Sequence, residues 1–163
     1  MRKTKVLVAD DNLDLRSGLE IQLLVHGYEV ITCINADAAV AHAQKHKPDV
    51  MVIDIWMDEG SRLILSGSGN GFGVIERINK LPETQGIPVI YITGQNSPQL
   101  DVRAKQLGAF GLIHKPVNFA SLLKMVELAS QTRALCDGAT EDAQKTADYP
   151  MTAASGATSI GEA

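Results

Sequence analysis

Cysteine is scarce in this sequence, with only Cys33 and Cys136 among 163 residues and no CxxC pair. This scarcity excludes a disulfide-stabilised scaffold, and two isolated thiols do not predict a zinc site. Long hydrophobic runs are also missing, because every apolar stretch is far shorter than the roughly 20 residues of a membrane-spanning helix. The N-terminal segment reaches its first acidic pair too soon for a secretory signal. We therefore expect a cytoplasmic protein that does not insert into a membrane.

Positive charge is scarce in the last part of the chain. Residues 1–135 hold 14 Lys+Arg against 14 Asp+Glu, a net charge of zero, whereas residues 136–163 hold one Lys against five acidic residues, a net charge of −4. Nucleic-acid backbones attract clustered positive charge, which neither part supplies. We therefore expect no direct nucleic-acid binding.

Apolar segments of two kinds alternate along the chain. Short ones, rich in β-branched residues, predict five strands at residues 5–9, 28–34, 49–55, 88–93 and 111–114. Segments with helical periodicity predict five helices at residues 13–26, 36–45, 72–81, 98–107 and 119–135. Asn35, Asn118 and the pair Ser97-Pro98 are predicted to begin three of these helices. The alternation predicts an α/β fold with a doubly wound, five-stranded parallel sheet covered by helices on both faces.

Two segments do not fit this alternation. Residues 58–70, which include SRLILSGSG, lengthen the loop after the third strand, and we interpret them as a lid, a partner-docking strip or a tolerated surface loop. Residues 136–163 are rich in Ala, Thr, Ser and Gly without apolar periodicity, which predicts a disordered tail. We therefore expect one domain over residues 1–135, with an inserted loop at about 58–70 and a disordered tail at 136–163.

Polar residues interrupt the apolar pattern where the strands end. These residues are Asp10, Asp11, Asp54, Thr93 and Lys115, and Gly94 follows Thr93 directly. Because ligands of open α/β sheets bind beyond the carboxyl ends of the strands, we expect these side chains to share one crevice. Three carboxylates in one crevice repel each other unless a cation neutralises them, and hard oxygen ligands suit Mg²⁺. The sequence therefore predicts a magnesium site built from Asp10, Asp11 and Asp54.

The remaining residues of this group suit a phosphoryl ligand. An ammonium and a hydroxyl, here Lys115 and Thr93, can both engage phosphoryl oxygens while a metal offsets the rest of the charge. A buried carboxylate beside them, Asp54, can attack phosphorus and form an acyl phosphate. The pattern therefore predicts phosphoryl transfer to Asp54.

The order Asp10-Asp11, Asp54, Thr93 and Lys115-Pro116, together with the alternation of strands and helices, resembles the receiver domain of two-component response regulators over about residues 3–133. The resemblance implies a flavodoxin-like sheet of order 2-1-3-4-5 and a single-domain, chemotaxis-regulator-like protein. It also implies that Asp54 receives its phosphoryl group from a phosphohistidine on a sensor histidine kinase or a histidine phosphotransfer protein. The output is then a contact with another protein.

The resemblance assigns a role to each site residue. Asp11 is expected to bind Mg²⁺ directly and Asp10 through water, and the backbone carbonyl of Trp56 is expected to be a further ligand. Thr93 and the amide of Gly94 are expected to contact the phosphoryl oxygens, and Lys115 to pair with them. The Lys115-Pro116 bond is expected to be cis.

The sequence departs from the family pattern in three places. Met57 is followed by Asp58 where the family has proline, and the segment that opens the third helix comes about nine residues late, at residues 70–72. Leu112 stands where the family has the aromatic switch residue of the fifth strand, so an aromatic rotation cannot report phosphorylation. Trp56, two residues after the acceptor, is expected to shield the acyl phosphate from water.

Two other functions remain open at this point. A receiver-like binding module that takes no phosphate is favoured by the insertion beside the site. An aspartyl-phosphate hydrolase of the haloacid dehalogenase kind needs a second Asp where Trp56 stands, so we expect a phosphoacceptor rather than an enzyme with an external substrate. The histidines are given no metal-binding role. His26, His42 and His46 are expected to face solvent, and His114 is expected to point away from the site.

Overall fold

The computed structural model describes residues 1–57 and 71–147. The predicted insertion at 58–70 therefore lies outside the described residues, as does the tail from residue 148. The strands are β1 (Lys5–Ala9), β2 (Glu29–Cys33), β3 (Val50–Asp54), β4 (Val89–Thr93) and β5 (Gly111–His114). The helices are α1 (Leu13–Val25), α2 (Ala36–His46), α3 (Gly71–Asn79), α4 (Pro98–Gln106) and α5 (Phe119–Ala147).

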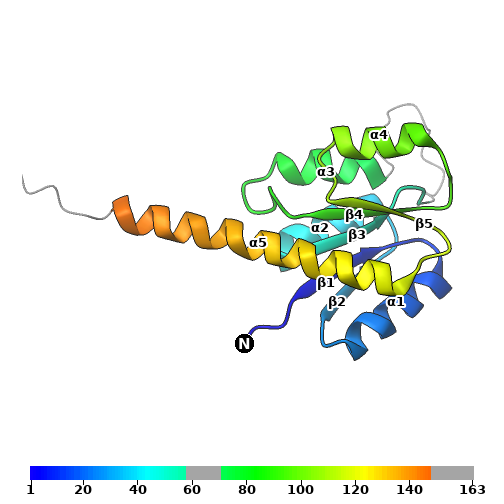
Figure 1. Ribbon diagram of the computed structural model, residues 1–163, viewed down its shortest axis with the longest axis horizontal. Helices are drawn as coiled ribbons and strands as arrows, with labels where there is room; N and C mark the ends of the chain where they lie inside the picture. Colours follow the sequence, from blue (N-terminus) through cyan, green and yellow to red (C-terminus); the bar gives the residue numbers. More distant parts are fainter. Residues whose placement is uncertain (58–70, 148–163) are drawn as a thin grey trace, which may run out of the picture.

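The sheet has the order β2-β1-β3-β4-β5, and each neighbouring pair is parallel (Figure 1). This order confirms the predicted doubly wound fold. Such an order reverses direction beside β1, so the connections after β1 and β3 diverge and leave a crevice at the carboxyl edge. The ends of β1 and β3 are adjacent there, since Ala9 pairs with Ile53.

Two apolar layers cover the two faces of the sheet. On one face, α1 and α5 pack on alternate strand residues through Leu19, Leu23, Leu122, Val126 and Ala129. On the other face, α2, α3 and α4 pack on the intervening strand residues. Because side chains alternate along a strand, strands covered on both faces are apolar throughout, as in the fully buried β3 and β4.

Three of the helix starts are capped by asparagine. The side-chain oxygens of Asn12, Asn35 and Asn118 each accept a hydrogen bond from a backbone N–H three residues on, at 2.9, 2.8 and 3.0 Å. Ser97 does not cap α4 through its side chain, contrary to the prediction; its hydroxyl donates to Oε1 of Gln99 instead, at 2.6 Å. Pro98 begins α4 as predicted, and proline removes one of the N–H groups that a cap satisfies.

The last helix is longer than predicted. It continues beyond residue 135 to Ala147 and extends past the body of the molecule (Figure 1), so the expectation of disorder from residue 136 is wrong for residues 136–147. Elongating a helix that is already packed needs no new nucleus, and its continuation is rich in alanine. An ion pair at i,i+4 spacing, Arg133 Nε to Asp137 Oδ2 at 3.3 Å, adds to this preference. None of the helices in the described parts is both long and apolar enough to span a bilayer.

Candidate functional site

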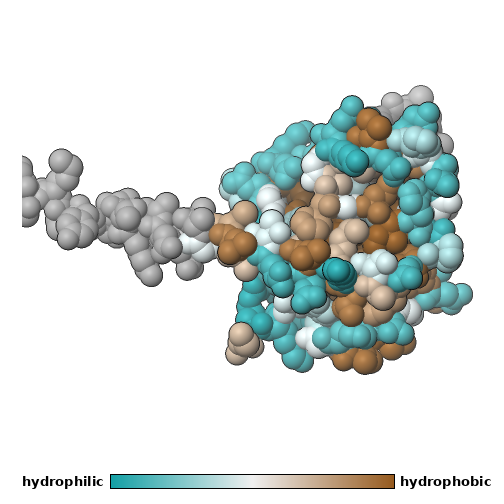
Figure 2. Space-filling view, viewed as in Figure 1, coloured by the Kyte–Doolittle hydropathy of each residue, from teal (hydrophilic) through white to brown (hydrophobic). Residues whose placement is uncertain are grey.

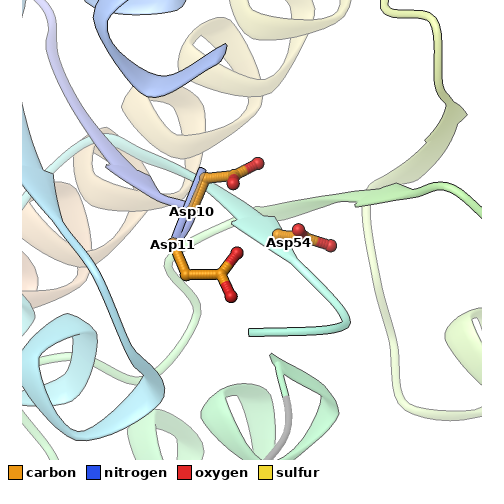
Figure 3. Close-up of side chains that lie close together, drawn as sticks. All are labelled: Asp10, Asp11 and Asp54. Carbon is orange, nitrogen blue, oxygen red and sulfur yellow. The ribbon is translucent and has the colours of Figure 1, made fainter. Parts of the chain in front are cut away.

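The acidic residues meet at the carboxyl edge of the two central strands. Asp10 follows β1, and Asp54 is the last residue of β3; both are buried, with 1% and 3% of their surface exposed. Asp11 follows Asp10 at the start of the β1–α1 connection and is exposed. One carboxylate oxygen from each residue lies within 4.8 Å of the others. Figure 3 shows the Asp10, Asp11 and Asp54 side chains turned toward the same side of the strand ends.

Lys115 brings a positive charge to these carboxylates. Its backbone N–H donates a 2.7 Å hydrogen bond to the carbonyl of Thr93, which fixes the residue beside the end of β4. Its Nζ atom lies 2.8 Å from Oδ2 of Asp54 and 3.3 Å from Oδ2 of Asp10. The Lys115–Pro116 bond is cis, as the resemblance implied.

Burial and these contacts set the protonation of the pair. Burial raises the pKa of Asp54, and it outweighs the hydrogen bonds from Lys115 and from the Trp56 N–H, which lower that pKa; the charge of Asp10 adds to the rise. Burial alone would lower the pKa of Lys115, but its hydrogen bond to Asp54 and the charges of both aspartates raise that pKa overall. Asp54 therefore keeps its proton to a higher pH than an ordinary aspartate does, and Lys115 stays a cation.

The site fits a hard divalent cation. Oδ1 of Asp10 accepts a 2.7 Å hydrogen bond from the Asn12 N–H, but Oδ2 of Asp10 is buried and accepts no well-aligned hydrogen bond, although Lys115 lies 3.3 Å away. An unsatisfied buried carboxylate oxygen is costly. Three carboxylates against one ammonium also leave an excess of negative charge, and oxygen donors of this kind suit Mg²⁺. Asp10, Asp11 and Asp54 can therefore hold magnesium.

Thr93 and Gly94 lie at the same edge. Thr93 is fully buried at the end of β4, one position beyond Ile92, the register partner of Asp54. Its hydroxyl accepts a 3.1 Å hydrogen bond from the N–H of Gln95. A side chain at Gly94 would stand 3.9 Å from Cδ of Lys115, so the glycine adjoins the lysine stem. The structure thus brings the two residues to the crevice, and their contact with a phosphoryl group stays a prediction.

Trp56 takes part through its backbone. Its N–H donates a 3.0 Å hydrogen bond to Oδ1 of Asp54, so both carboxylate oxygens of Asp54 have a donor. The residue itself is 46% exposed. Its carbonyl as a metal ligand and its shielding of an acyl phosphate remain predictions.

His114 does not join the site. Its Nε2 atom lies 3.4 Å from Oδ1 of Asp101 on α4, which agrees with the expectation that it points away.

Two residues near the acidic cluster were missed by the sequence interpretation. Arg16 on α1 donates a 2.7 Å hydrogen bond from Nη1 to the backbone carbonyl of Asp10. Gly71 begins α3 with an N–H that donates to the carbonyl of Ile55 at 3.0 Å, and a side chain there would collide with the Asp54 carbonyl. Arg16 could have been noticed in the sequence because it is a cation in the first half of a predicted helix, where the helix dipole disfavours positive charge.

The chain resembles known proteins over most of its length. The profile of the family "Response regulator receiver domain" matches residues 6–127. The protein PilH of Pseudomonas aeruginosa is 33% identical over 122 residues, which cover 75% of this chain and 93% of PilH. The nitrogen assimilation regulatory protein NtrX of Azorhizobium caulinodans is 32% identical over 147 residues, which cover 90% of this chain and 30% of NtrX. The structure of the Vibrio cholerae chemotaxis protein CheY4 has 29% identity and a TM-score of 0.68, covering 78% of this chain and 99% of CheY4.

Proposed function

The chain belongs to the response regulator receiver family and is a phosphorylation-activated receiver; on that premise we propose that Asp54 is the residue that accepts the phosphoryl group. The donor is a phosphohistidine of a sensor histidine kinase or a histidine phosphotransfer protein. One contact supports this proposal most directly: Nζ of Lys115 lies 2.8 Å from Oδ2 of Asp54. We propose further that residues 1–135 act as one receiver domain.

The transfer uses an oxygen of the Asp54 carboxylate as the nucleophile. An O–P bond forms as the P–N bond of the phosphohistidine breaks, and the departing imidazole keeps the electron pair and takes up a proton. Lys115, now held by Asp54 and Asp10, offers its ammonium to the phosphoryl oxygens as negative charge moves onto them. Thr93 and the Gly94 amide supply further donors at this edge.

Asp11, Asp54 and the Trp56 carbonyl would hold Mg²⁺ directly and Asp10 would hold it through water, and the bound ion would neutralise charge on the phosphoryl group. One carboxylate oxygen from each of the three aspartates lies within 4.8 Å of the others, which is compatible with a shared ion. Arg16 positions these ligands indirectly, because its hydrogen bond to the Asp10 carbonyl fixes the backbone that carries Asp10 and Asp11.

A partner that delivers the phosphoryl group needs a surface beside the crevice, and α1 offers one. Leu13, Ile21, Leu24 and Val25 are exposed on this helix. Figure 2 shows apolar side chains along the lower edge of the molecule, over α1. A cavity of about 470 Å³ beside them is lined by Leu15, Leu19, Lys115, Pro116, Val117 and Phe119, among others. We propose that a helical partner packs here.

The output is proposed to be a contact with another protein. Leu112 is half-buried against the α2–α3–α4 layer, and it has no ring whose rotation could signal. We therefore expect phosphorylation to shift the populations of a two-state surface around α4, β5 and α5.

The proposal is tested by incubating the full chain with Mg²⁺ and acetyl phosphate and measuring its intact mass. We expect a gain of one phosphoryl group in the wild type and none in Asp54→Asn. Asp14→Asn is the matched control, since Asp14 is an exposed acid in the first turn of α1, and it should label normally. Absence of labelling in the wild type would favour a binding module that takes no phosphate. Release of phosphate in large excess over protein would favour a hydrolase.

A further inference from the structure

Two histidines of α2 lie side by side at the opposite end of the sheet from Asp54. His42 and His46 are four residues apart, and their rings are 5.5 Å apart between centroids with an angle of 21° between the planes. Both residues are half-buried, so the expectation that they simply face solvent is only partly correct. Their spacing was given no metal-binding role from the sequence, but residues at i and i+4 on a helix share one face. Two imidazoles at this spacing can bind one metal ion.

Charged residues of both signs lie around the last turn of α2. Nζ of Lys5 donates to the carbonyl of His46 at 3.2 Å and lies 3.6 Å from Oε1 of Glu29 on β2. Lys5 therefore links the Glu29 carboxylate to the last turn of α2. The partial negative charge at a helix C-terminus also favours a cation. The positive charges of three lysines nearby act against a bound cation: Lys5, Lys45 and Lys47.

We propose that His42 and His46 form a chelating site for a divalent transition-metal ion, of the class Ni²⁺, Zn²⁺ or Cu²⁺. Neutral imidazole suits these ions, whereas Mg²⁺ prefers oxygen ligands. Once one ring binds, the second is held at a high effective concentration by the helix. Within the described residues, the only cluster of three or more His, Cys, Asp or Glu able to hold a metal is Asp10, Asp11 and Asp54, so water completes the coordination at the histidine pair.

The histidine site is separate from the acidic site. His46 ends α2 just before β3 begins at Val50, whereas Asp54 is the last residue of the same strand. The two sites are therefore at opposite edges of the sheet, and they differ in ligand type. Magnesium can accordingly occupy the acidic site while a second ion is titrated into the histidine site.

The test is calorimetric titration of NiCl₂ into the full chain at pH 7.5 with saturating Mg²⁺. We expect one Ni²⁺ per chain and at least tenfold weaker binding in each of His42→Gln and His46→Gln, because either change leaves a single imidazole. His26→Gln is the matched control, since His26 is an exposed histidine next to α1 without a second histidine one turn away, and it should bind like the wild type. Circular dichroism establishes that each variant is folded.

Two further variants assign the bound ion. Cys136→Ser and Asp54→Asn should bind Ni²⁺ like the wild type, because the exposed thiol and the acidic site are not its ligands. A rise in the melting temperature on adding Ni²⁺, lost in both His42→Gln and His46→Gln, would support the site independently. The proposal is overturned if His46→Gln binds Ni²⁺ as tightly as the wild type, or if binding disappears in Cys136→Ser or Asp54→Asn.

Discussion

Nζ of Lys115 lies 2.8 Å from Oδ2 of Asp54, so a side chain that follows β5 reaches past β4 to the end of β3. The same atom is 3.3 Å from Oδ2 of Asp10. Two nearly fully buried carboxylates therefore share one ammonium. The stability of this edge of the sheet depends on that cation whenever no metal is bound.

Replacing Lys115 with methionine should destabilise the metal-free protein at neutral pH. The change keeps much of the side-chain volume but leaves Asp54 and Asp10 without their cation, and we expect a loss of about 1–3 kcal/mol. Urea unfolding in EDTA measures it. Lys124→Met, on the exposed side of α5, is the control and should change stability by less than about 0.5 kcal/mol. Equal losses in the two variants would contradict the shared-cation arrangement.

Asp54→Asn should become more stable than the wild type as pH rises, in the absence of metal. The raised pKa of Asp54, caused chiefly by burial, means that the folded protein keeps the proton after the unfolded chain has released it. Its stabilising contribution is thus complete below the ordinary value of 3.8 and is lost as pH rises through the folded pKa. Melting temperatures between pH 4 and 7 should show the variant gaining on the wild type. A wild type that gains instead would reverse the sign and refute the argument.

Magnesium should stabilise the protein through Asp11. An ion that binds the folded state alone adds about 2.7 kcal/mol at one hundred times its dissociation constant, and EDTA should remove this gain. Asp11→Asn loses one carboxylate ligand and should bind Mg²⁺ at least about tenfold more weakly. The single tryptophan, Trp56, donates its N–H to Asp54, so its fluorescence should report the titration. Asp14→Asn should keep the wild-type affinity; a loss there would point to a general charge effect.

Gly71→Ala should destabilise the protein by about 1–3 kcal/mol, because overpacking forces the backbone apart. A Cβ at this position would meet the Asp54 carbonyl oxygen and stand 2.9 Å from Cα of Ile55. Gly18→Ala in α1 is the matched control. It has nothing within 4 Å, so the higher helix propensity of alanine should stabilise by about 0.5–1 kcal/mol. Chemical denaturation of both variants gives the comparison, and a neutral Gly71→Ala would show that α3 can move away.

The two cysteines should react at different rates with a thiol reagent. Cys33 is buried, and burial raises its pKa to about 12 despite the nearby Arg16, which lowers it. Cys136 is exposed on α5. Because the thiolate is the reactive form, Ellman's reagent should modify one thiol quickly in the native protein and two after unfolding. Cys136→Ser should abolish the fast phase, and a remaining fast phase would mean that Cys33 is accessible.

The fold and the acidic cluster were predictable because they follow from local sequence and topology. Apolar strands alternating with helices require a parallel sheet, and a parallel sheet puts the ends of all its strands on one edge. Asp10, Asp11, Asp54 and Lys115 could therefore be placed together from their positions at or just after strand ends, and the structure brings them together.

Contacts that depend on how helices lie on the sheet could not be predicted. Leu24 and Leu128 fit the helical period of a buried face but are exposed, because the helix axis decides which flank meets the strands. Arg16 reaches the Asp10 carbonyl only once α1 is docked. The end of α5 was missed for another reason, since residues beyond 135 lack apolar periodicity and persist as helix by elongation.

Helix α5 extends well beyond the part that packs on the sheet, so its C-terminal end moves when the packed part tilts. Among its described side chains, Ala129 is the last in the buried layer on that face, Arg133 still donates to the Gln85 carbonyl, and the helix runs on to Ala147. At 1.5 Å per residue the part beyond Arg133 is about 21 Å long, so a tilt of about 5° at the packed end displaces the far end by about 2 Å. A small change in how Leu122 and Val126 pack on the sheet therefore produces a larger displacement at the C-terminal end of α5.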